Sequence, residues 1–102
     1  MAADDSLLLC CLLWAVPGQA DAMSAYEDSV LALLPEHGGE VTQRLRGTGA
    51  DGSPDEVQVF RFDSRSAVDS YLADPRRLAL SDERDRVVAR TELFPVREPQ
   101  TA

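Results

Sequence analysis

The chain has 102 residues with 18 acidic and 10 basic side chains, all of the latter arginine, and a formal charge of −8. This length predicts a single domain over residues 1–102, with its core over 6–96 and a polar tail over 97–102. Nucleic-acid binding needs a basic stripe that displaces counterions from phosphates. An acidic chain without such a stripe is not expected to bind nucleic acid.

The segment 6–16 is apolar at both odd and even positions. Successive side chains of a strand point to opposite faces of a sheet, so a strand here needs cover on both sides. A chain this short lays helices over one face only. We therefore expect the other face to meet a second copy, which predicts a homodimer joined through the sheet.

The same segment also resembles the hydrophobic region of a secretory signal, followed by a small-residue cleavage site. Asp4 and Asp5 precede it, however, where a signal peptide carries Lys or Arg. The apolar run is also shorter than the roughly 20 residues that span a bilayer. Cys10 and Cys11 would point to opposite faces and cannot pair with each other, and buried thiols suit a reducing compartment. We expect a cytoplasmic protein without a membrane segment, with export as the alternative.

A helix is expected over 20–37, because apolar residues recur there at the helical period. Asp21 or Ser24 is expected to cap its N-terminus, and Gly38 follows its end, where glycine is favoured. The predicted apolar stripe consists of Met23, Tyr26, Val30, Leu33 and Leu34. Glu27 lies outside this stripe and is expected to face solvent.

The rest of the chain predicts a hairpin, a second helix and a last strand. Strands are expected over 40–47 and 56–63, joined by a loop rich in Gly, Asp and Pro. Ser64 is expected to cap the next helix, and 87–96 reads as a final strand. The order β-α-β-β-α-β is the ferredoxin-like α+β arrangement. Right-handed crossovers place its two main helices on one face of a four-stranded antiparallel sheet.

Several short stretches resemble a known superfamily. They are Tyr26-Glu27-Asp28, Glu36-His37-Gly38-Gly39-Glu40-Val41, Pro54-Asp55-Glu56-Val57 leading into Phe60-Arg61-Phe62-Asp63-Ser64-Arg65, and the segment 71–80. Over about residues 6–96 the chain resembles the dimeric α/β-barrel superfamily. Within it, the chain is similar to a branch of domains of unknown function related to antibiotic-biosynthesis-monooxygenase-like proteins. The superfamily also includes small isomerases, lactone-forming enzymes, haem-degrading enzymes and members without known activity.

Three arginines are candidate ligands for an anion. If Phe60 and Phe62 face the helices, Arg61 faces the space between the two sheets of a dimer, and Arg44 and Arg46 face it by the same parity. Guanidinium groups in a space of low dielectric bind carboxylates or enolates through paired hydrogen bonds. The alternative is that these arginines pair with acidic residues of the same or the partner subunit.

His37 is the only histidine and a candidate general base near neutral pH. The alternative is a histidine that interacts with a helix C-terminus. Trp14, Tyr26 and Tyr71 are candidate pocket walls, although aromatic residues at such spacings also form cores. One histidine and two oppositely directed cysteines do not predict a metal site, and no cofactor is expected.

Two classes of function follow. The first is a small enzyme or binding protein that takes a hydrophobic, anionic metabolite without a cofactor, similar to a monooxygenase or an isomerase, with Arg61 and His37 as its catalytic residues. The second is a noncatalytic dimeric binding or stress-related module with a packed interior. A pocket of several hundred Å³ lined by Arg61 or Trp14 would favour the first.

Overall fold

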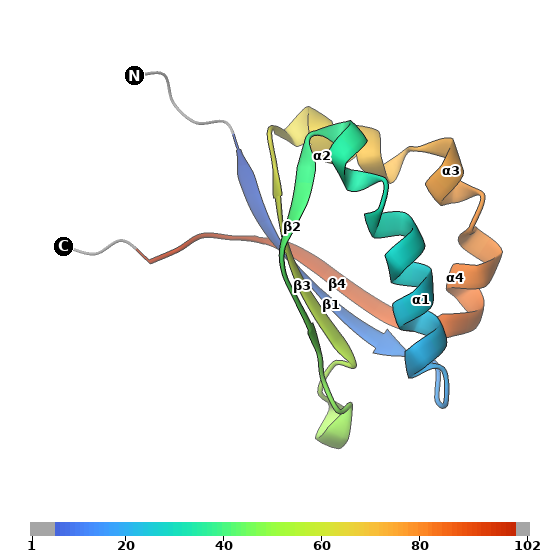
Figure 1. Ribbon diagram of the computed structural model, residues 1–102. Helices are drawn as coiled ribbons and strands as arrows, with labels where there is room; N and C mark the ends of the chain where they lie inside the picture. Colours follow the sequence, from blue (N-terminus) through green and yellow to red (C-terminus); the bar gives the residue numbers. More distant parts are fainter. Residues whose placement is uncertain (1–5, 100–102) are drawn as a thin grey trace.

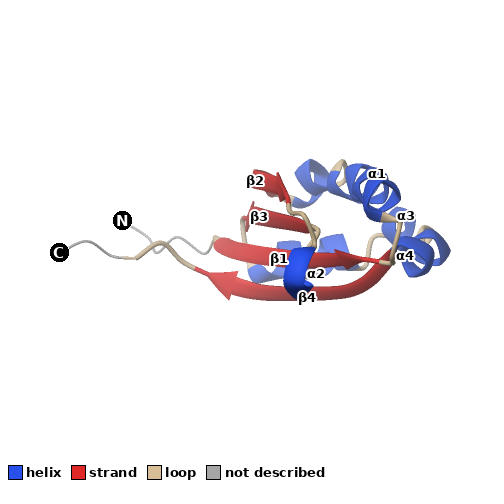
Figure 2. Ribbon diagram, turned by 90° about the horizontal axis from the view of Figure 1, so that it is seen from below, coloured by secondary structure: helices blue, strands red, loops and turns tan. Residues whose placement is uncertain are grey.

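The computed structural model describes residues 6–99, which form a four-stranded antiparallel sheet with helices over one face (Figure 1). The elements are β1 (Leu7–Ala15), α1 (Ala20–Leu31), η1 (Leu34–His37), β2 (Gly39–Arg46), η2 (Ala50–Gly52), β3 (Glu56–Phe62), α2 (Arg65–Leu72), α3 (Pro75–Leu78), α4 (Ser81–Val87) and β4 (Val88–Val96). The strands lie in the order β2-β3-β1-β4, as Figure 2 shows. This confirms the expected ferredoxin-like α+β fold. The expectations that rest on Asp4, Asp5 and the end of the 97–102 tail lie outside the described residues.

The first strand has the two apolar faces that its sequence predicts. Leu9, Cys11 and Leu13 are buried beneath the helices, whereas the alternate side chains of β1 are half-buried on the opposite face. The core includes Met23, Tyr26, Val30 and Leu34 from the helical side and Phe60 and Phe62 from β3. Within residues 6–99, no helix is both long enough and apolar enough to cross a bilayer.

The first helix is shorter than expected. It ends at Leu31, and a separate 3₁₀ turn, η1, begins three residues later. Pro35 lies at the start of η1, where its missing N–H and its constraint on the preceding residue oppose continuation of the α-helix. The N-cap is Gln19, without a side-chain hydrogen bond. The expectation that Asp21 or Ser24 caps this helix was therefore wrong, because the helix begins at Ala20, ahead of both residues.

The second main helix begins as predicted. The Ser64 hydroxyl accepts a hydrogen bond from the backbone N–H of Ala67, 3.1 Å away. Ser64→Ala removes this cap and is expected to lower the free energy of unfolding by about 1 kcal/mol. Urea denaturation measures the change. Ser29→Ala, on the exposed side of α1, is the control and should change stability by less than about 0.5 kcal/mol; equal losses would contradict the capping role.

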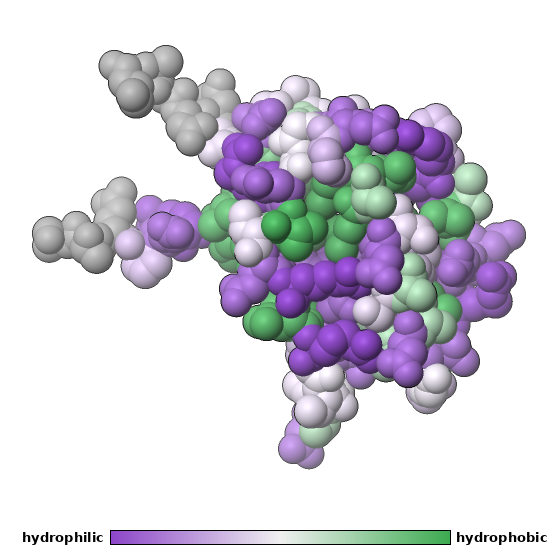
Figure 3. Space-filling view, viewed as in Figure 1, coloured by the Kyte–Doolittle hydropathy of each residue, from purple (hydrophilic) through white to green (hydrophobic). Residues whose placement is uncertain are grey.

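The sheet face opposite the helices is apolar at its centre and charged at its corners. Its apolar and aromatic residues include Leu8, Cys10, Leu12 and Trp14 of β1, Leu45 of β2, Val57 and Val59 of β3, and Phe94 and Val96 of β4. Arg61 pairs with Glu40 at one corner, and Arg90 pairs with Glu92 at another. We call this surface of the sheet the open face. Figure 3, which has the view of Figure 1 and shows the molecule from the side on which the helices are also seen, has hydrophobic side chains between hydrophilic ones.

Candidate functional site

A cleft lies between the covered face of the sheet and helices α1, α2, α3 and α4. Its polar lining consists of Glu27, Gln58, Tyr71, Arg77, Arg84 and Thr91, and leucine, valine and phenylalanine side chains form most of the remainder. The enclosed cavity of the cleft has a volume of about 60 Å³. The empty space is about 430 Å³ when the solvent at the mouth of the cleft is included. The enclosed part therefore has room for a few waters or the polar end of a small ligand.

Gln58 is fully buried and links two carboxyl groups. Its Nε2 atom donates to Glu27 Oε1 at 2.9 Å and to Glu56 Oε2 at 2.7 Å. Both hydrogens of the amide are thereby used, which fixes its orientation. The remaining Oε1 atom of Gln58 is buried and has no hydrogen-bond partner. Gln58 therefore offers an unused acceptor beside the cleft.

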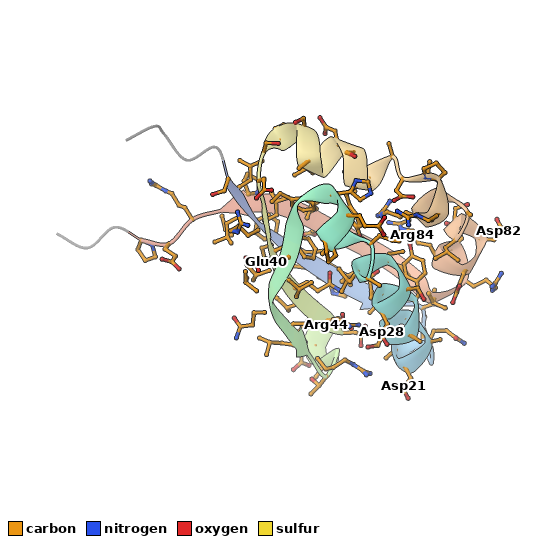
Figure 4. All side chains as sticks on the ribbon, turned by 45° about the horizontal axis from the view of Figure 1, so that its top comes forward. Asp21, Asp28, Glu40, Arg44, Asp82 and Arg84 are labelled. Atoms are coloured by element: carbon orange, nitrogen blue, oxygen red, sulfur yellow. The ribbon has the colours of Figure 1, made fainter. Side chains whose placement is uncertain are left out.

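The charge of Glu56 is balanced from β2. Arg44 Nε donates to Glu56 Oε2 at 2.6 Å, and Arg44 Nη1 contacts Asp28 Oδ1 at 2.5 Å. A further contact joins Arg44 Nη2 to the carbonyl oxygen of Ser24 at 2.9 Å. Figure 4 shows Arg44 beside Asp28, between β2 and α1. The guanidinium closes the side of the network that faces away from the cleft.

Glu27 is 6% exposed, and burial is the main reason that its pKa is raised above its ordinary value. The hydrogen bond from Gln58 opposes this effect, the charge of Glu56 adds to it, and Arg77 and Arg44 lower the pKa. Burial likewise raises the pKa of Cys11 to about 12. Cys11 is thus a neutral thiol near pH 7 and not a nucleophile.

Arg77 supplies an unused donor. Its guanidinium lies 5.3 Å from the centroid of the Tyr71 ring, and its buried Nε–H has no hydrogen-bond partner. The Tyr71 hydroxyl is itself occupied, because it donates to the carbonyl oxygen of Val30 at 3.0 Å. Nearby, Arg84 Nη2 donates to Thr91 Oγ1 at 3.3 Å. The cleft therefore combines a free donor on Arg77 with a free acceptor on Gln58.

The predicted arginine cluster is not assembled. Arg61 faces the open side as expected, but it pairs with Glu40 and Asp63 of its own chain. Arg44 and Arg46 point to the helix side, which corrects their expected placement. The register shifts between Val41 and Gln43, and such a bulge adds one residue and reverses the facing of those that follow.

The predicted aromatic walls are also divided between the two faces. Trp14 faces the open side, where its indole N–H donates to the Gly52 carbonyl oxygen at 2.9 Å and Arg90 stacks on its ring. Tyr26 is buried in the core, and Tyr71 lines the cleft. The structure therefore brings only Tyr71 of the predicted set to the cleft, and the cleft is lined by neither Arg61 nor Trp14.

His37 lies outside the cleft lining and joins η1 to the helices beyond it. Its Nδ1 atom lies 2.7 Å from Ser70 Oγ, and its Nε2 atom lies 2.7 Å from Asp74 Oδ2. Asp74 also caps α3 and pairs with Arg76, which itself contacts Glu36. Ser70 lies inside α2, where the neighbouring backbone N–H groups donate within the helix. The side-chain contacts of His37, Ser70, Asp74 and Arg76 form a clamp between η1 and α2–α3.

The clamp makes stability depend on pH through Asp74. Hydrogen bonds from Arg76 and His37 lower the pKa of Asp74 well below its ordinary value. A depressed carboxyl pKa stabilises the fold above the unfolded pKa, and this contribution is lost as the pH falls toward the folded pKa. We expect wild-type stability to fall below about pH 4, and to fall less steeply in Asp74→Asn. Urea midpoints from pH 7 to pH 3 measure this, and parallel curves would contradict it.

Glu27, Gln58 and Arg77 were missed as site residues. Two of them carried a signal: Glu27 lies one turn from Met23 and one turn from Leu31, in the middle of the buried side of α1. Gln58 shares strand parity with Phe60, which was already expected to face the helices. A polar residue on a face that is predicted to be buried is a signal for a candidate functional site. Arg77 had no comparable signal, because its position depends on the turn between α2 and α3.

No grouping of His, Cys, Asp or Glu within residues 6–99 has the arrangement of a metal site. No family model matches the chain, and no protein of curated function matches it either. Solved structures do. A protein of unknown function from Rhodopseudomonas palustris is 17% identical with a TM-score of 0.75, covering 97% of this chain and 86% of that one.

Two further structures link the fold to named groups. A protein from Bacteroides thetaiotaomicron, provisionally named an antibiotic biosynthesis monooxygenase, is 13% identical with a TM-score of 0.73, covering 95% of this chain and 92% of that one. A NIPSNAP-family protein of unknown function from Agrobacterium tumefaciens is 17% identical with a TM-score of 0.74, covering 99% and 95%. Identities this low show a shared fold and no shared activity. They confirm the resemblance inferred from the sequence at the level of the ferredoxin-like fold.

Proposed function

We propose that the protein is a homodimer that binds a small, partly apolar anion in the helix–sheet cleft of each protomer, without a cofactor. The observation that carries the proposal is the pair of unpartnered atoms at the cleft, Arg77 Nε and Gln58 Oε1. A buried polar group without a hydrogen bond costs about 1–3 kcal/mol. A ligand with an anionic oxygen and a hydrogen-bond donor would satisfy both atoms.

The charge around the cleft favours an anion at the Arg77 end. Glu56 is already paired with Arg44, and one oxygen of Glu27 is held by the Gln58 amide. Arg77, by contrast, has an N–H without an acceptor. A carboxylate accepts paired hydrogen bonds from a guanidinium, and such bonds are stronger than those between neutral groups. The apolar side chains of the lining would contact the rest of the ligand.

The open face supports the dimer. On this face Phe94 is 38% exposed and Leu45 is 52% exposed. The arginines on its corners are paired with glutamates of the same chain, so the formal charge of −8 does not concentrate on this surface. A two-fold axis through an apolar centre would let two copies bury the same patch. Burial of each large side chain would contribute about 1.5–3 kcal/mol.

A noncatalytic dimeric module, including a stress-related one, is the second candidate. The small enclosed volume of the cleft, about 60 Å³, favours this noncatalytic candidate. In that case the cleft would hold only a few ordered waters. The two candidates differ in whether a metabolite-sized anion displaces those waters.

Native mass spectrometry and calorimetry test the proposal together. We expect a mass of twice 11.1 kDa at micromolar concentration. We also expect binding of phenylpyruvate, a small aromatic keto acid whose carboxylate would accept from Arg77 and whose enol O–H would donate to Gln58. Arg77→Gln is expected to weaken this binding at least tenfold, because it removes the cation that pairs with the carboxylate. Arg65→Gln is the control, since Arg65 is an exposed residue of α2. A monomer would refute the dimer, and equal affinities would refute the role of Arg77.

A further inference from the structure

Glu27 is a carboxyl group held inside a cleft rather than on the helix surface. It is 6% exposed, and one of its oxygens is fixed by the amide of Gln58 at 2.9 Å. The unpartnered N–H of Arg77 belongs to the same cleft lining. A carboxyl that shares a cleft with a free cationic donor is suited to moving a proton while a negative charge forms on a substrate oxygen.

We propose that Glu27 is the general base and acid of a proton-transfer reaction, and that its substrates are 2-oxo acids with a hydrogen on the carbon next to the keto group. The proposal rests on the binding function proposed above. In a 2-oxo acid the carboxylate and carbonyl oxygens are adjacent, so a single guanidinium can contact both. The substrate carbon next to the keto group would then lie toward Glu27. The hydrogen bond from Gln58 holds the Glu27 carboxyl in place.

The step is balanced without an oxidant or another reactant. The C–H bond breaks and its proton moves to the Glu27 carboxylate. The electron pair of that bond forms the carbon–carbon double bond of an enolate, and the negative charge develops on the former carbonyl oxygen, which accepts a hydrogen bond from Arg77. Return of the proton from Glu27 to the carbon restores the keto acid, and protonation of the oxygen gives the enol.

The surroundings of Glu27 suit this role. Burial raises its pKa, and a base whose pKa lies closer to the working pH accepts and returns a proton more readily. The titratable and charged groups that act on Glu27 or share its cleft are Cys11 of β1, Tyr26 of α1, Arg44 of β2, Glu56 of β3, Tyr71 of α2, Arg77 of α3 and Arg84 of α4. Cys11 and Tyr71 have a pKa of about 12 and stay neutral near pH 7.

Hydrogen–deuterium exchange at C3 of phenylpyruvate and of 2-oxobutyrate, followed by proton NMR in D₂O, tests the proposal. We expect the protein to exceed the protein-free rate, and Glu27→Gln to lose at least about 100-fold of the acceleration, the lower end for a general base. The rate should rise as the pH passes through the pKa of Glu27, and this dependence should vanish in Glu27→Gln. Glu98→Gln, an exposed residue beyond the end of β4, should keep the full rate.

Two further experiments distinguish a chemical role of Glu27 from a structural one. Glu27→Asp retains a carboxylate at a shorter reach and should show a reduced rate that still depends on pH, whereas a purely structural role predicts no such rescue. Phenylacetone lacks the carboxylate of phenylpyruvate and should exchange no faster with protein than without it. Binding of either keto acid without faster exchange would overturn the proton-transfer role and leave the binding function standing. Absence of binding of both acids would overturn the two proposals together.

Discussion

Val59→Arg is expected to convert the proposed dimer into monomers. Val59 lies at the centre of the open face, in register with Cys10 on one neighbouring strand and Gln43 on the other. In a two-fold interface the new charge would be buried twice without a partner, and burial of each unpaired ion costs several kcal/mol. About 4 kcal/mol corresponds to a loss of roughly 1,000-fold in the dimer association constant.

Sedimentation equilibrium of the variant and the wild type measures this effect. The monomer should still fold, because Val59 is only partly buried by its own chain and its replacement leaves the helix-side core intact. Ser29→Arg makes the same change of charge on the exposed side of α1 and should leave the dimer unchanged. A Val59→Arg protein that sediments as a dimer at micromolar concentration would show that the open face is not the interface.

Arg44→Ala is expected to lower the free energy of unfolding by about 3 kcal/mol, the lower end for a buried ion pair that loses one partner. Glu56 is fully buried, and Arg44 is the cation that contacts it. Without that cation the Glu56 carboxylate would lie uncompensated beside Gln58 and Glu27. The expected loss arises mainly from the charge left behind, so the double variant Arg44→Ala/Glu56→Gln should recover much of it.

Arg46→Ala is the matched control for Arg44→Ala. Arg46 comes from the same strand and faces the same side, but its partner Asp21 has a side chain that is 99% exposed. Exposed pairs of this kind contribute at most about 1 kcal/mol. Urea denaturation of the four proteins separates the cases. Equal losses from Arg44→Ala and Arg46→Ala would mean that the buried network has no special dependence on its cation.

Alternation in the sequence divided the side chains of β1 into two apolar sets, but it did not say which set the helices cover; the structure places Leu9 on the covered face. In β3 the condition that Phe60 faces the helices holds, and Val59 and Arg61 share the other face. In β2 the same reasoning failed for Arg44 after one register shift. A bulge arises from the fit between two strands, and the sequence of β2 alone does not predict it.

The candidate site was predictable only in part, for a related reason. An arginine that binds an anion was expected, but it was sought on the strands, whereas the structure offers Arg77 from the short helix α3. The position of α3 depends on the clamp around Asp74 and on packing between elements distant in the sequence. Gln58 and Glu27 were the exceptions. Strand parity placed Gln58 on the same face as Phe60, and helical spacing placed Glu27 between Met23 and Leu31.

The most direct test of the proposed ligand site is an NMR titration with phenylpyruvate that follows side-chain N–H signals on both sides of the sheet. Arg77 Nε–H and the Gln58 amide report on the cleft, whereas the indole N–H of Trp14, the single tryptophan, reports on the open face. We expect the Arg77 and Gln58 signals to shift with saturation and the Trp14 signal to stay in place. A shift of Trp14 with Arg77 and Gln58 unmoved would contradict the assignment of the ligand site to the helix–sheet cleft.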